Sequence, residues 1–341
     1  MDVVVNTRTT RGALGGQQRV ALEISKRLGA IERLAPKAAL GGAKGHLWEQ
    51  AVLPLRARGR LLWSPSSTGP LLYRRQIVTL HDVAFIDRPE FFSRNFARFY
   101  RAFIPQLVRR VAKVVTVSEF SRQRIAAAFA LDPATIEVIG HGVSENFRRY
   151  GADEISRTRA ALGLDKRYLV LQATSDRRKN LHRTLAAWKA AQDRVAPDIV
   201  LAVTGNLGRA HVFGDIGPIE ADPRVRLLGF VDEAQIGPLI SGAEAFLFPS
   251  IYEGFGLPII EAMACGTPVL TSDATATGEV AGDAALLVDP LDVASIANGI
   301  LKLVGDDELR ASLSAAGLAH ARRYNWDDAA ARYQRLFAQI A

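Results

Sequence analysis

The sequence predicts an α/β protein with two domains, each built around a parallel β-sheet. Short apolar runs alternate with helical stretches, the pattern of parallel strands joined by crossover helices. The 341 residues suffice for about two domains. Charge is uneven, because residues 1–150 hold 24 of the 43 basic residues but only 11 of the 35 acidic ones. We therefore expect a domain boundary near residue 150 and an anionic partner for the N-terminal half.

The first half begins with a short apolar strand and a glycine pair. The predicted strands are Val3–Val5, Leu61–Trp63, Ile77–Leu80 and Val114–Val117. Gly15 and Gly16 lie between the first strand and a helix whose apolar residues recur from Val20 to Leu28. A phosphate or sugar often meets the backbone at such a place, although a turn also needs glycine.

An aromatic and basic segment, Pro89–Lys113, is predicted to form an amphipathic surface. Arg94, Arg98 and Arg101 share one helical face, and Phe92, Phe96, Phe99 and Phe103 share another. Two interpretations remain open: a helix lying on an anionic membrane, or a core helix with a solvated basic face. Nucleic acid is not expected as a partner, since no nucleic-acid-binding motif accompanies the basic residues.

The second half follows a linker predicted at Arg148–Asp153 and repeats the alternation. A helical piece, Ile155–Leu162, precedes the first of these strands. The predicted strands are Tyr168–Gln172, Val200–Thr204, Ala245–Phe248, Val269–Thr271 and Ala285–Val288. The chain is mostly helical from Ser295, and its last helix spans about Trp326–Ile340.

The stretch Pro249–Pro268 carries the strongest functional signal. We expect a helix that starts at Pro258 and stops at Gly266. Glu253 then lies ahead of this helix and Glu261 in its first turn. Two carboxylates beside a helix N-terminus suit a ligand with both phosphate and hydroxyl groups, such as a nucleotide sugar. The alternative is a strand–turn–helix in which Glu261 only complements the helix dipole.

Two further patterns lie at predicted strand ends, where ligands bind in parallel sheets. The basic pair Arg178-Lys179 stands between a strand and a helix, a suitable place to hold a diphosphate. A solvated run of loop charges is the alternative. His81-Asp82 directly follows a strand, although a lone histidine is more often structural than catalytic.

The stretch Tyr252–Val269 reads YEGFGLPIIEAMACGTPV and resembles the signature of the retaining glycosyltransferases of family 4, which share the GT-B fold. The strings VSEFSR at Val117–Arg122 and RKNL at Arg178–Leu181 are similar to that family's. The resemblance implies two Rossmann-like domains facing across a cleft. Residues 1–150 would form the acceptor domain, with helix 326–341 packing back on it, and residues 151–325 the donor domain.

The resemblance also implies roles for individual residues. Glu253 would bind the hydroxyls of the donor sugar, Glu261 the ribose, and Lys179 with Arg178 the diphosphate. His81 would contact the donor sugar. Backbone positions near the ligand would be Gly15, Gly16, Gly254, Phe255, Gly256, Leu257 and, at the nucleobase, Val231. The chain departs from the family pattern at Ala173, where many relatives have arginine, and at His141, which replaces asparagine.

The implied reaction is transfer of a hexose, with retention, to a saccharide or lipid-diphosphate-linked acceptor in bacterial polysaccharide synthesis. No cofactor or catalytic metal is expected. The run from Leu47 to Pro54 and the HDVAF and PEFF elements resemble those of bacterial polysaccharide mannosyl- and rhamnosyltransferases. That resemblance favours GDP-mannose as donor, ahead of UDP-glucose and dTDP-rhamnose. Rival functions are a phosphorylase, a sugar-nucleotide hydrolase and a non-catalytic, membrane-associated sugar-nucleotide sensor.

The expected location is the cytoplasm, with peripheral binding at the inner face of the cytoplasmic membrane. The start of the chain is too quickly polar for a signal peptide. The single cysteine, Cys265, excludes an internal disulfide and fits a reducing compartment.

Overall fold

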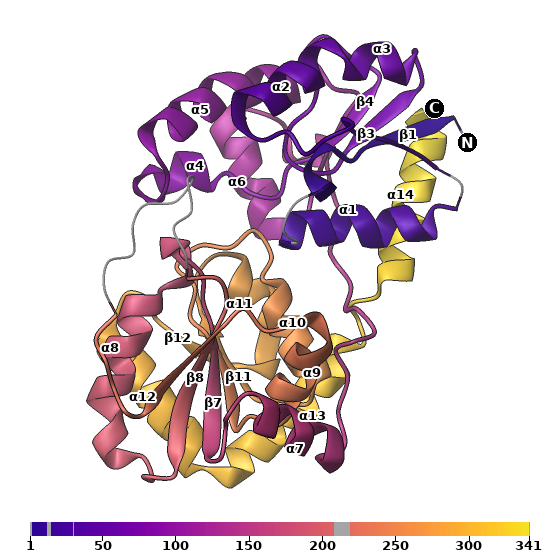
Figure 1. Ribbon diagram of the computed structural model, residues 1–341. Coiled ribbons are helices and arrows are strands. Elements are labelled where there is room, and N and C mark those ends of the chain that lie inside the picture. Colours follow the sequence, from indigo (N-terminus) through magenta and orange to yellow (C-terminus); the bar gives the residue numbers. More distant parts are fainter. Residues whose placement is uncertain (1, 12–14, 30, 208–218, 341) are drawn as a thin grey trace. The chain divides into compact units, whose positions relative to one another are not determined.

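A computed structural model describes residues 2–11, 15–29, 31–207 and 219–340 (Figure 1). Within these residues the chain forms two six-stranded sheets in which every strand pair is parallel, which confirms the α/β class. The chain divides into two compact units. The first unit comprises Met1–Asp87, Arg94–Gly142 and Asn325–Ala341. The second comprises Arg88–Ser93 and Val143–Tyr324.

The sheet of the first unit has the order β2-β1-β3-β4-β5-β6. Its strands are β1 (Val3–Asn6), β2 (Glu32–Leu34), β3 (Leu61–Ser64), β4 (Gln76–Thr79), β5 (Lys113–Thr116) and β6 (Ile136–Val138). Four of them match predicted strands. The other two, β2 and β6, form the two edges of the sheet and are three residues long.

The helices of the first unit cover both faces of its sheet. They are η1 (Arg8–Arg11), α1 (Gly16–Arg27), α2 (Gly42–Ala51), α3 (Leu53–Ala57), α4 (Ala84–Asp87), α5 (Arg94–Val108), α6 (Glu119–Phe129), η3 (Pro133–Thr135) and α14 (Trp326–Ile340). On β3, Leu62 packs in a cluster with Trp48 of α2 and Leu53 of α3. Its neighbour Trp63 instead contacts Tyr333 of α14, with ring centroids 4.7 Å apart. Figure 1 shows α14, the yellow C-terminal helix, beside α1.

The sheet of the second unit has the order β12-β11-β10-β7-β8-β9. Its strands are β7 (Arg167–Gln172), β8 (Ile199–Thr204), β9 (Val225–Gly229), β10 (Ala245–Phe248), β11 (Val269–Ser272) and β12 (Leu286–Val288). The four central strands are almost fully buried, since helices cover both faces. This double coverage explains why their sequences are continuous apolar runs.

The helices of the second unit supply the apolar residues that cover this sheet. They are η2 (Pro89–Phe91), α7 (Ala152–Ala161), η4 (Arg177–Lys179), α8 (Leu181–Ala191), η5 (Gln192–Arg194), α9 (Glu233–Ser241), α10 (Leu257–Ala264), α11 (Thr275–Ala281), η6 (Gly282–Ala284), α12 (Val293–Gly305) and α13 (Asp307–Ala321). Alternate residues of β7 enter different clusters: Leu169 packs with Trp188 of α8, and Val170 with Met263 of α10. Burying each such large apolar side chain contributes about 1.5–3 kcal/mol.

Candidate functional site

The second sheet reverses its direction of growth between β7 and β10. The chain adds β8 and β9 on one side of β7 and then returns to add β10, β11 and β12 on the other. In open α/β sheets, ligands bind beyond the carboxyl ends of the strands at such a point. The segments that leave β7 and β10 here are residues 173–180 and 249–256. These two segments form the candidate site of the second unit.

An ion pair joins the two segments. Lys179 Nζ lies 2.7 Å from Glu253 Oε1, and the two side chains are 21% and 14% exposed. The ammonium also lies 4.7 Å from the centroid of the Phe248 ring, a cation–π contact. Partial burial strengthens the field of both charges while leaving them accessible. A cation and a carboxylate side by side can bind a phosphate and sugar hydroxyls respectively.

Hydrogen bonds hold the two segments against each other. The N–H of Ile251 donates to the carbonyl oxygen of Arg178 at 2.8 Å. Asn180 has φ of 60°, a conformation that asparagine tolerates better than most residues. Its buried side-chain amide donates to the carbonyl oxygens of Pro249 and Pro290 at 2.9 and 2.7 Å. The Lys179–Glu253 pair is therefore held by structure on both sides.

The guanidinium of Arg178 is ion-paired with Asp176. Its Nη2 lies 2.6 Å and its Nε 2.9 Å from Asp176 Oδ2, and the side chains are 16% and 5% exposed. Asp176 also caps η4 by accepting from the N–H of Arg178 at 2.9 Å. The positive charge of Arg178 is thus offset locally, whereas its guanidinium is held in a defined position.

The helix that follows Glu253, α10, begins one residue earlier than the sequence predicts. Gly256 has φ of 98° and turns the chain into the helix directly before Leu257. Pro258 is therefore the second helical residue, and the first turn contains no acidic residue. Glu261 consequently lies just past the first turn, where it is 7% exposed. A role as a charge at the helix start is excluded for Glu261 by this position.

Val231, the residue predicted at the nucleobase, follows β9 at the edge of the same sheet. It is 7% exposed and packs in the cluster that contains Leu239. The N–H of Gly205 donates to the carbonyl oxygen of Gly229 at 2.8 Å, which ties the carboxyl ends of β8 and β9 together. The backbone near Val231 is therefore held at the same edge of the sheet as Lys179.

His81 follows β4 in the first unit and is almost fully buried. Its Nε2 lies 2.8 Å from the carbonyl oxygen of Pro65. Because a carbonyl only accepts, Nε2 carries the proton and Nδ1 is an acceptor. Burial lowers the pKa of His81, against the opposing effects of the Pro65 carbonyl and Asp82. His81 is thus a neutral ring whose Nδ1 can accept a hydrogen bond from a hydroxyl group.

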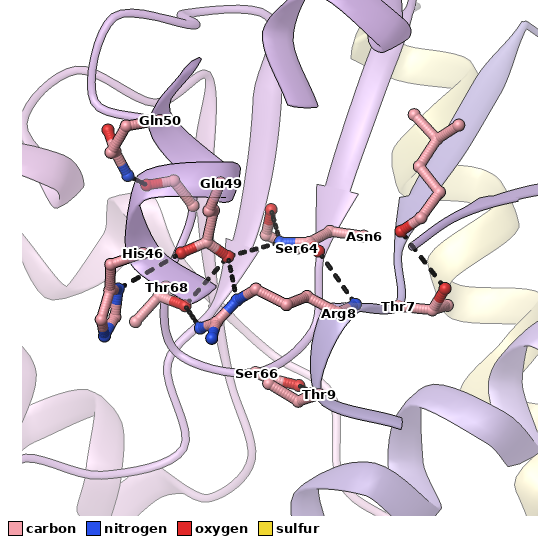
Figure 2. Close-up of polar contacts among 12 residues, drawn as sticks. Asn6, Thr7, Arg8, Thr9, His46, Glu49, Gln50, Ser64, Ser66 and Thr68 are labelled. Atoms are coloured by element: carbon pink, nitrogen blue, oxygen red, sulfur yellow. Dashed lines mark hydrogen bonds and ion pairs between the residues drawn. The ribbon is translucent and has the colours of Figure 1, made fainter. Parts of the chain in front are cut away.

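A buried polar network joins the carboxyl ends of β1 and β3, where the first sheet reverses its growth (Figure 2). Glu49 Oε1 accepts from Asn6 Nδ2 at 2.6 Å and Thr68 Oγ1 at 3.1 Å, and Arg8 Nε lies 3.4 Å away. Burial acts to raise the pKa of Glu49, but its contact with His46, the charge of Arg8 and the hydrogen bonds from Asn6 and Thr68 together outweigh burial, so the pKa is lowered. The network fixes the segments after β1 and β3.

The glycine pair lies at the start of α1 in the first unit. Gly15 is the N-cap residue, and its N–H donates to Gln18 Oε1 at 3.1 Å. Gly16 is the first helical residue. Both are exposed, so the backbone at this helix start is accessible to a ligand.

Comparison with known families agrees with these features. Residues 153–320 match the model of "Glycosyl transferases group 1", and residues 59–147 match that of "Glycosyltransferase Family 4". The chain is also 31% identical over 270 residues to O-antigen chain mannosyltransferase B of Escherichia coli, covering 76% of this chain and 70% of that protein. The chain belongs to glycosyltransferase family 4. The resemblance found in the sequence is confirmed.

Other relatives of this glycosyltransferase are matched over smaller shares of their length. O-antigen chain mannosyltransferase RfbU of Salmonella typhimurium is 31% identical over 235 residues, 68% of this chain and 62% of that protein. A phosphatidyl-myo-inositol mannosyltransferase of Mycobacterium tuberculosis is 34% identical over 152 residues, 42% of this chain and 40% of that protein.

Solved structures show that the glycosyltransferase has the GT-B fold. HepE of Anabaena, solved with UDP-glucose, superposes with a TM-score of 0.79 at 20% identity, covering 99% of both chains. WaaG, a glycosyltransferase involved in lipopolysaccharide biosynthesis, gives a TM-score of 0.76 at 15% identity, covering 98% of this chain and 99% of that one. At these identities the likeness concerns the fold.

The predicted site residues of the glycosyltransferase fall into two groups. The second unit brings together Lys179, Arg178 and Glu253 at the carboxyl edge of its sheet, with Gly254–Leu257 and Glu261 following directly. The first unit carries His81, Gly15 and Gly16, and its own polar network.

Sequence reasoning missed three residues that organise these groups. Asp176 and Asn180 flank the basic turn η4, and their value as cap and left-handed residues was visible in the sequence as Asp and Asn beside a short turn. Glu49 was noticed only as part of a string resembling mannosyltransferases. The available signal was that Glu49 lies between two buried apolar residues, Trp48 and Leu53, in a helical stretch, which indicates a buried carboxylate.

The part of the chain that the structure describes holds neither a metal-binding cluster nor a membrane-spanning helix. Residues 2–11, 15–29, 31–207 and 219–340 contain no group of three His, Cys, Asp or Glu side chains placed to hold a metal ion. In that same part of the chain, no helix combines the length and apolar character needed to cross a bilayer. A surface cavity lined by Ile155, Arg159 and Gly242 lies at the amino ends of β7 and β10 and contains none of the predicted site residues.

Proposed function

We propose that this glycosyltransferase moves a hexose, with mannose favoured, from a nucleotide-diphosphate sugar to a saccharide or lipid-linked saccharide acceptor in bacterial polysaccharide synthesis. The observation that carries the proposal is the Lys179–Glu253 pair, held 2.7 Å apart at the switch point between β7 and β10. Mannosyl transfer is supported by the names of the relatives in Escherichia coli and Salmonella typhimurium. GDP-mannose is accordingly the favoured donor, with UDP and dTDP sugars as alternatives.

The donor diphosphate lies against Lys179 in this proposal. A departing diphosphate gains negative charge as the bond to the sugar breaks, and a fixed ammonium stabilises that charge without reorganising. Arg178 adds a second guanidinium near the same phosphates, with its position set by Asp176. When the diphosphate binds, it replaces part of the interaction that Lys179 makes with Glu253.

Glu253 is released by this exchange to accept hydrogen bonds from sugar hydroxyls. Backbone N–H groups of Phe255 to Leu257 assist it, and Gly254 and Gly256 allow the ligand to approach closely. Glu261 accepts from the ribose hydroxyls. His81, neutral and with Nδ1 as its acceptor, takes a hydrogen bond from the donor sugar.

Transfer proceeds with retention in this proposal. The acceptor hydroxyl oxygen bonds to the anomeric carbon on the face from which the diphosphate departs. The bond from that carbon to the phosphate oxygen breaks, and its electrons leave with the nucleoside diphosphate. The acceptor proton passes to the departing phosphate oxygen. This route requires no side-chain nucleophile and no catalytic metal.

The acceptor and the membrane are assigned to the first unit. Its excess of basic residues suits an acceptor that carries a diphosphate, and α5 presents arginines to the inner face of an anionic membrane. In the cell we expect a cytoplasmic enzyme that binds this membrane peripherally.

Product analysis tests the proposed function. Purified enzyme is incubated with GDP-mannose, UDP-glucose or dTDP-rhamnose, with and without a lipid-linked saccharide, and products are identified by mass and by the anomeric proton coupling. Acceptor-dependent transfer with the donor's anomeric configuration is expected. Release of free sugar regardless of acceptor would instead indicate a hydrolase, and tight nucleotide binding without turnover a sensor.

A further inference from the structure

Six residues from the N-terminal half of the chain belong to the second unit. The segment Arg88–Ser93, which contains η2, clusters with the second unit, although Asp87 and Arg94 on either side belong to the first. It meets the second unit through two aromatic rings on two arginines. The Phe91 ring lies 5.9 Å from Arg177 Cζ, and the Phe92 ring 5.3 Å from Arg178 Cζ.

The Phe92 ring and Asp176 both contact the guanidinium of Arg178. Asp176 engages the Nε and Nη2 atoms of the guanidinium, and Phe92 lies over the cation. An aromatic ring attracts a cation through its negative face, more strongly where water is excluded, and the Arg178 side chain is only 16% exposed. Removing the ring would take away one of the contacts that hold this guanidinium in place.

The short turn η4 transmits this contact to the candidate site. Arg177 and Arg178 of this turn contact the two phenylalanine rings. The carbonyl oxygen of Arg178 also accepts a hydrogen bond from the N–H of Ile251 in the opposite segment. The next residue, Lys179, makes the ion pair with Glu253. A contact that holds the two arginines of this three-residue turn therefore also holds the Cα atom of Lys179 in place.

We propose that Phe92, assisted by Phe91, is a positioning residue for the donor diphosphate. The ring comes from the N-terminal half of the chain and holds η4 so that Arg178 and Lys179 face the two phosphates. The inference rests on the proposed function, because it takes the diphosphate to lie at Lys179. Neither phenylalanine touches the reacting atoms.

Calorimetric titration of Phe92→Leu with GDP and GMP tests the proposal, with UDP and UMP in parallel. We expect about fivefold weaker binding of the diphosphate, a cation–π contribution of about 1 kcal/mol converted at 1.4 kcal/mol per decade. Binding of the monophosphate should change less than twofold, because base and ribose contacts remain. Phe92→Tyr, which keeps the ring, should restore diphosphate affinity. If Phe92 had only a structural role, Phe92→Leu would weaken the binding of the diphosphate and of the monophosphate by the same factor.

The matched control is Tyr150→Leu. Tyr150 lies under Arg148, with Cζ 4.1 Å from the ring centroid, in the second unit but away from η4. This variant should bind GDP like the wild type. Arg178→Met provides a second test, because it removes the cation, and adding Phe92→Leu to it should cause no further loss if the ring acts through the guanidinium.

The outcomes separate the inference from the function on which it rests. Unchanged GDP affinity in Phe92→Leu, or an equal loss for GMP, would overturn the positioning role. Unchanged GDP affinity in Lys179→Ala would overturn the proposed function itself.

Discussion

The charges at the candidate site are already paired before any ligand binds. Lys179 is matched with Glu253 and Arg178 with Asp176, and all four side chains are less than a quarter exposed. A single unpaired cation here would carry a desolvation cost of several kcal/mol. Pairing offsets that cost and keeps each group in place, so a diphosphate finds a preorganised cation rather than a mobile one.

Removing either the ammonium or the second glutamate should slow turnover. We expect Lys179→Ala and Glu261→Ala each to reduce kcat/KM by at least tenfold, about 1.4 kcal/mol of transition-state stabilisation. Lys189→Ala is the control, because Lys189 forms an exposed ion pair with Glu220 outside the site, at 3.0 Å. Steady-state kinetics with donor and acceptor measure the effect. Wild-type rates in both site variants would remove the assignment of these residues.

His141 should make the first unit sensitive to acid. Burial, followed by the neighbouring His81, lowers the pKa of His141 well below the ordinary value of 6.5 for histidine. Below pH 6.5 His141 binds a proton in the unfolded chain but not in the folded one. The free energy of unfolding therefore decreases as the pH is lowered. Well above pH 6.5 both states are neutral and the effect is absent.

Replacing His141 tests that linkage. Urea unfolding at about pH 7.5 and about pH 5.5 should show a smaller acid-induced loss of stability in His141→Asn than in the wild type. His182→Asn, at an exposed position of α8, is the control and should leave the difference unchanged. Equal acid sensitivity in wild type and His141→Asn would contradict the prediction.

Which residues meet at the site was only partly predictable from the sequence. Lys179 and Glu253 stand out because their strings match a family pattern, but 74 positions separate them. Nothing in their spacing shows that they form an ion pair. The contacts of Phe92 and Asp176 with Arg178 depend likewise on tertiary structure, which composition and periodicity do not contain.

At the level of elements, α10 depends on the glycine before it. Gly256 has φ of 98°, and a Cβ there would lie 2.9 Å from Ile259 Cδ1. Gly256→Ala should therefore cost roughly 1–2 kcal/mol of stability through its left-handed backbone. It should also weaken GDP binding. Gly305→Ala, at the end of α12 with open space around it, is the control for thermal unfolding. Equal stability of Gly256→Ala and wild type would argue against a backbone requirement.

The helix α5 combines features of both interpretations left open by its sequence. Its apolar side is packed into the first unit through Phe103, Ile104 and Leu107. Phe99 is 42% exposed, and the arginines at positions 94, 98 and 101 are exposed. A membrane contact through α5 would therefore be mainly electrostatic, with Phe99 as its apolar part.

Vesicle flotation measures that contact. The wild type should float with vesicles of anionic lipid and not with zwitterionic ones, and binding should fall as salt rises. Replacing Arg94, Arg98 and Arg101 by Gln should abolish flotation. Replacing Arg157, Arg322 and Arg323, exposed in the second unit, should leave it intact. If the wild type remains with the soluble fraction, the membrane part of the proposal is lost.

Three strands are absent from the sequence prediction, β2, β6 and β9, and each lies at the edge of its sheet. β2 reads Glu-Arg-Leu with two exposed residues, and β6 reads Ile-Glu-Val. An edge strand has one neighbour and a solvated side, so it needs neither length nor continuous apolar character. The interior strands of the second sheet were predictable because they are buried on both faces and therefore read as continuous apolar runs.

For the whole molecule, the alternation of strands and helices predicts the α/β class, and the family strings predict GT-B. The points at which the chain passes from one unit to the other are harder to predict from the sequence. The units divide at Gly142 and Tyr324, and Arg88–Ser93 belongs to the second unit. These divisions depend on which surfaces pack, such as the Trp63 ring against Tyr333 of α14. Such long-range pairings leave little trace in local composition.

Nucleotide binding should stabilise the folded protein, and mainly its second unit. A ligand at 100 times its Kd adds about 2.7 kcal/mol to the folded state that binds it, a shift of roughly 5–10 °C for a unit of this size. A thermal-shift screen of GDP, UDP, dTDP and ADP should identify one base. Lys179→Ala should lose most of that shift, whereas Lys189→Ala should keep it.

Hydrogen exchange shows where the stabilisation lies. Because Lys179, Glu253 and Glu261 belong to the second unit, the nucleotide that gives the largest shift should slow amide exchange in residues 173–180 and 249–261. Exchange in β3 and β5 of the first unit should change little with the nucleotide alone. Protection confined to the first unit would mean that the nucleotide binds at the β1–β3 network rather than at the Lys179–Glu253 pair.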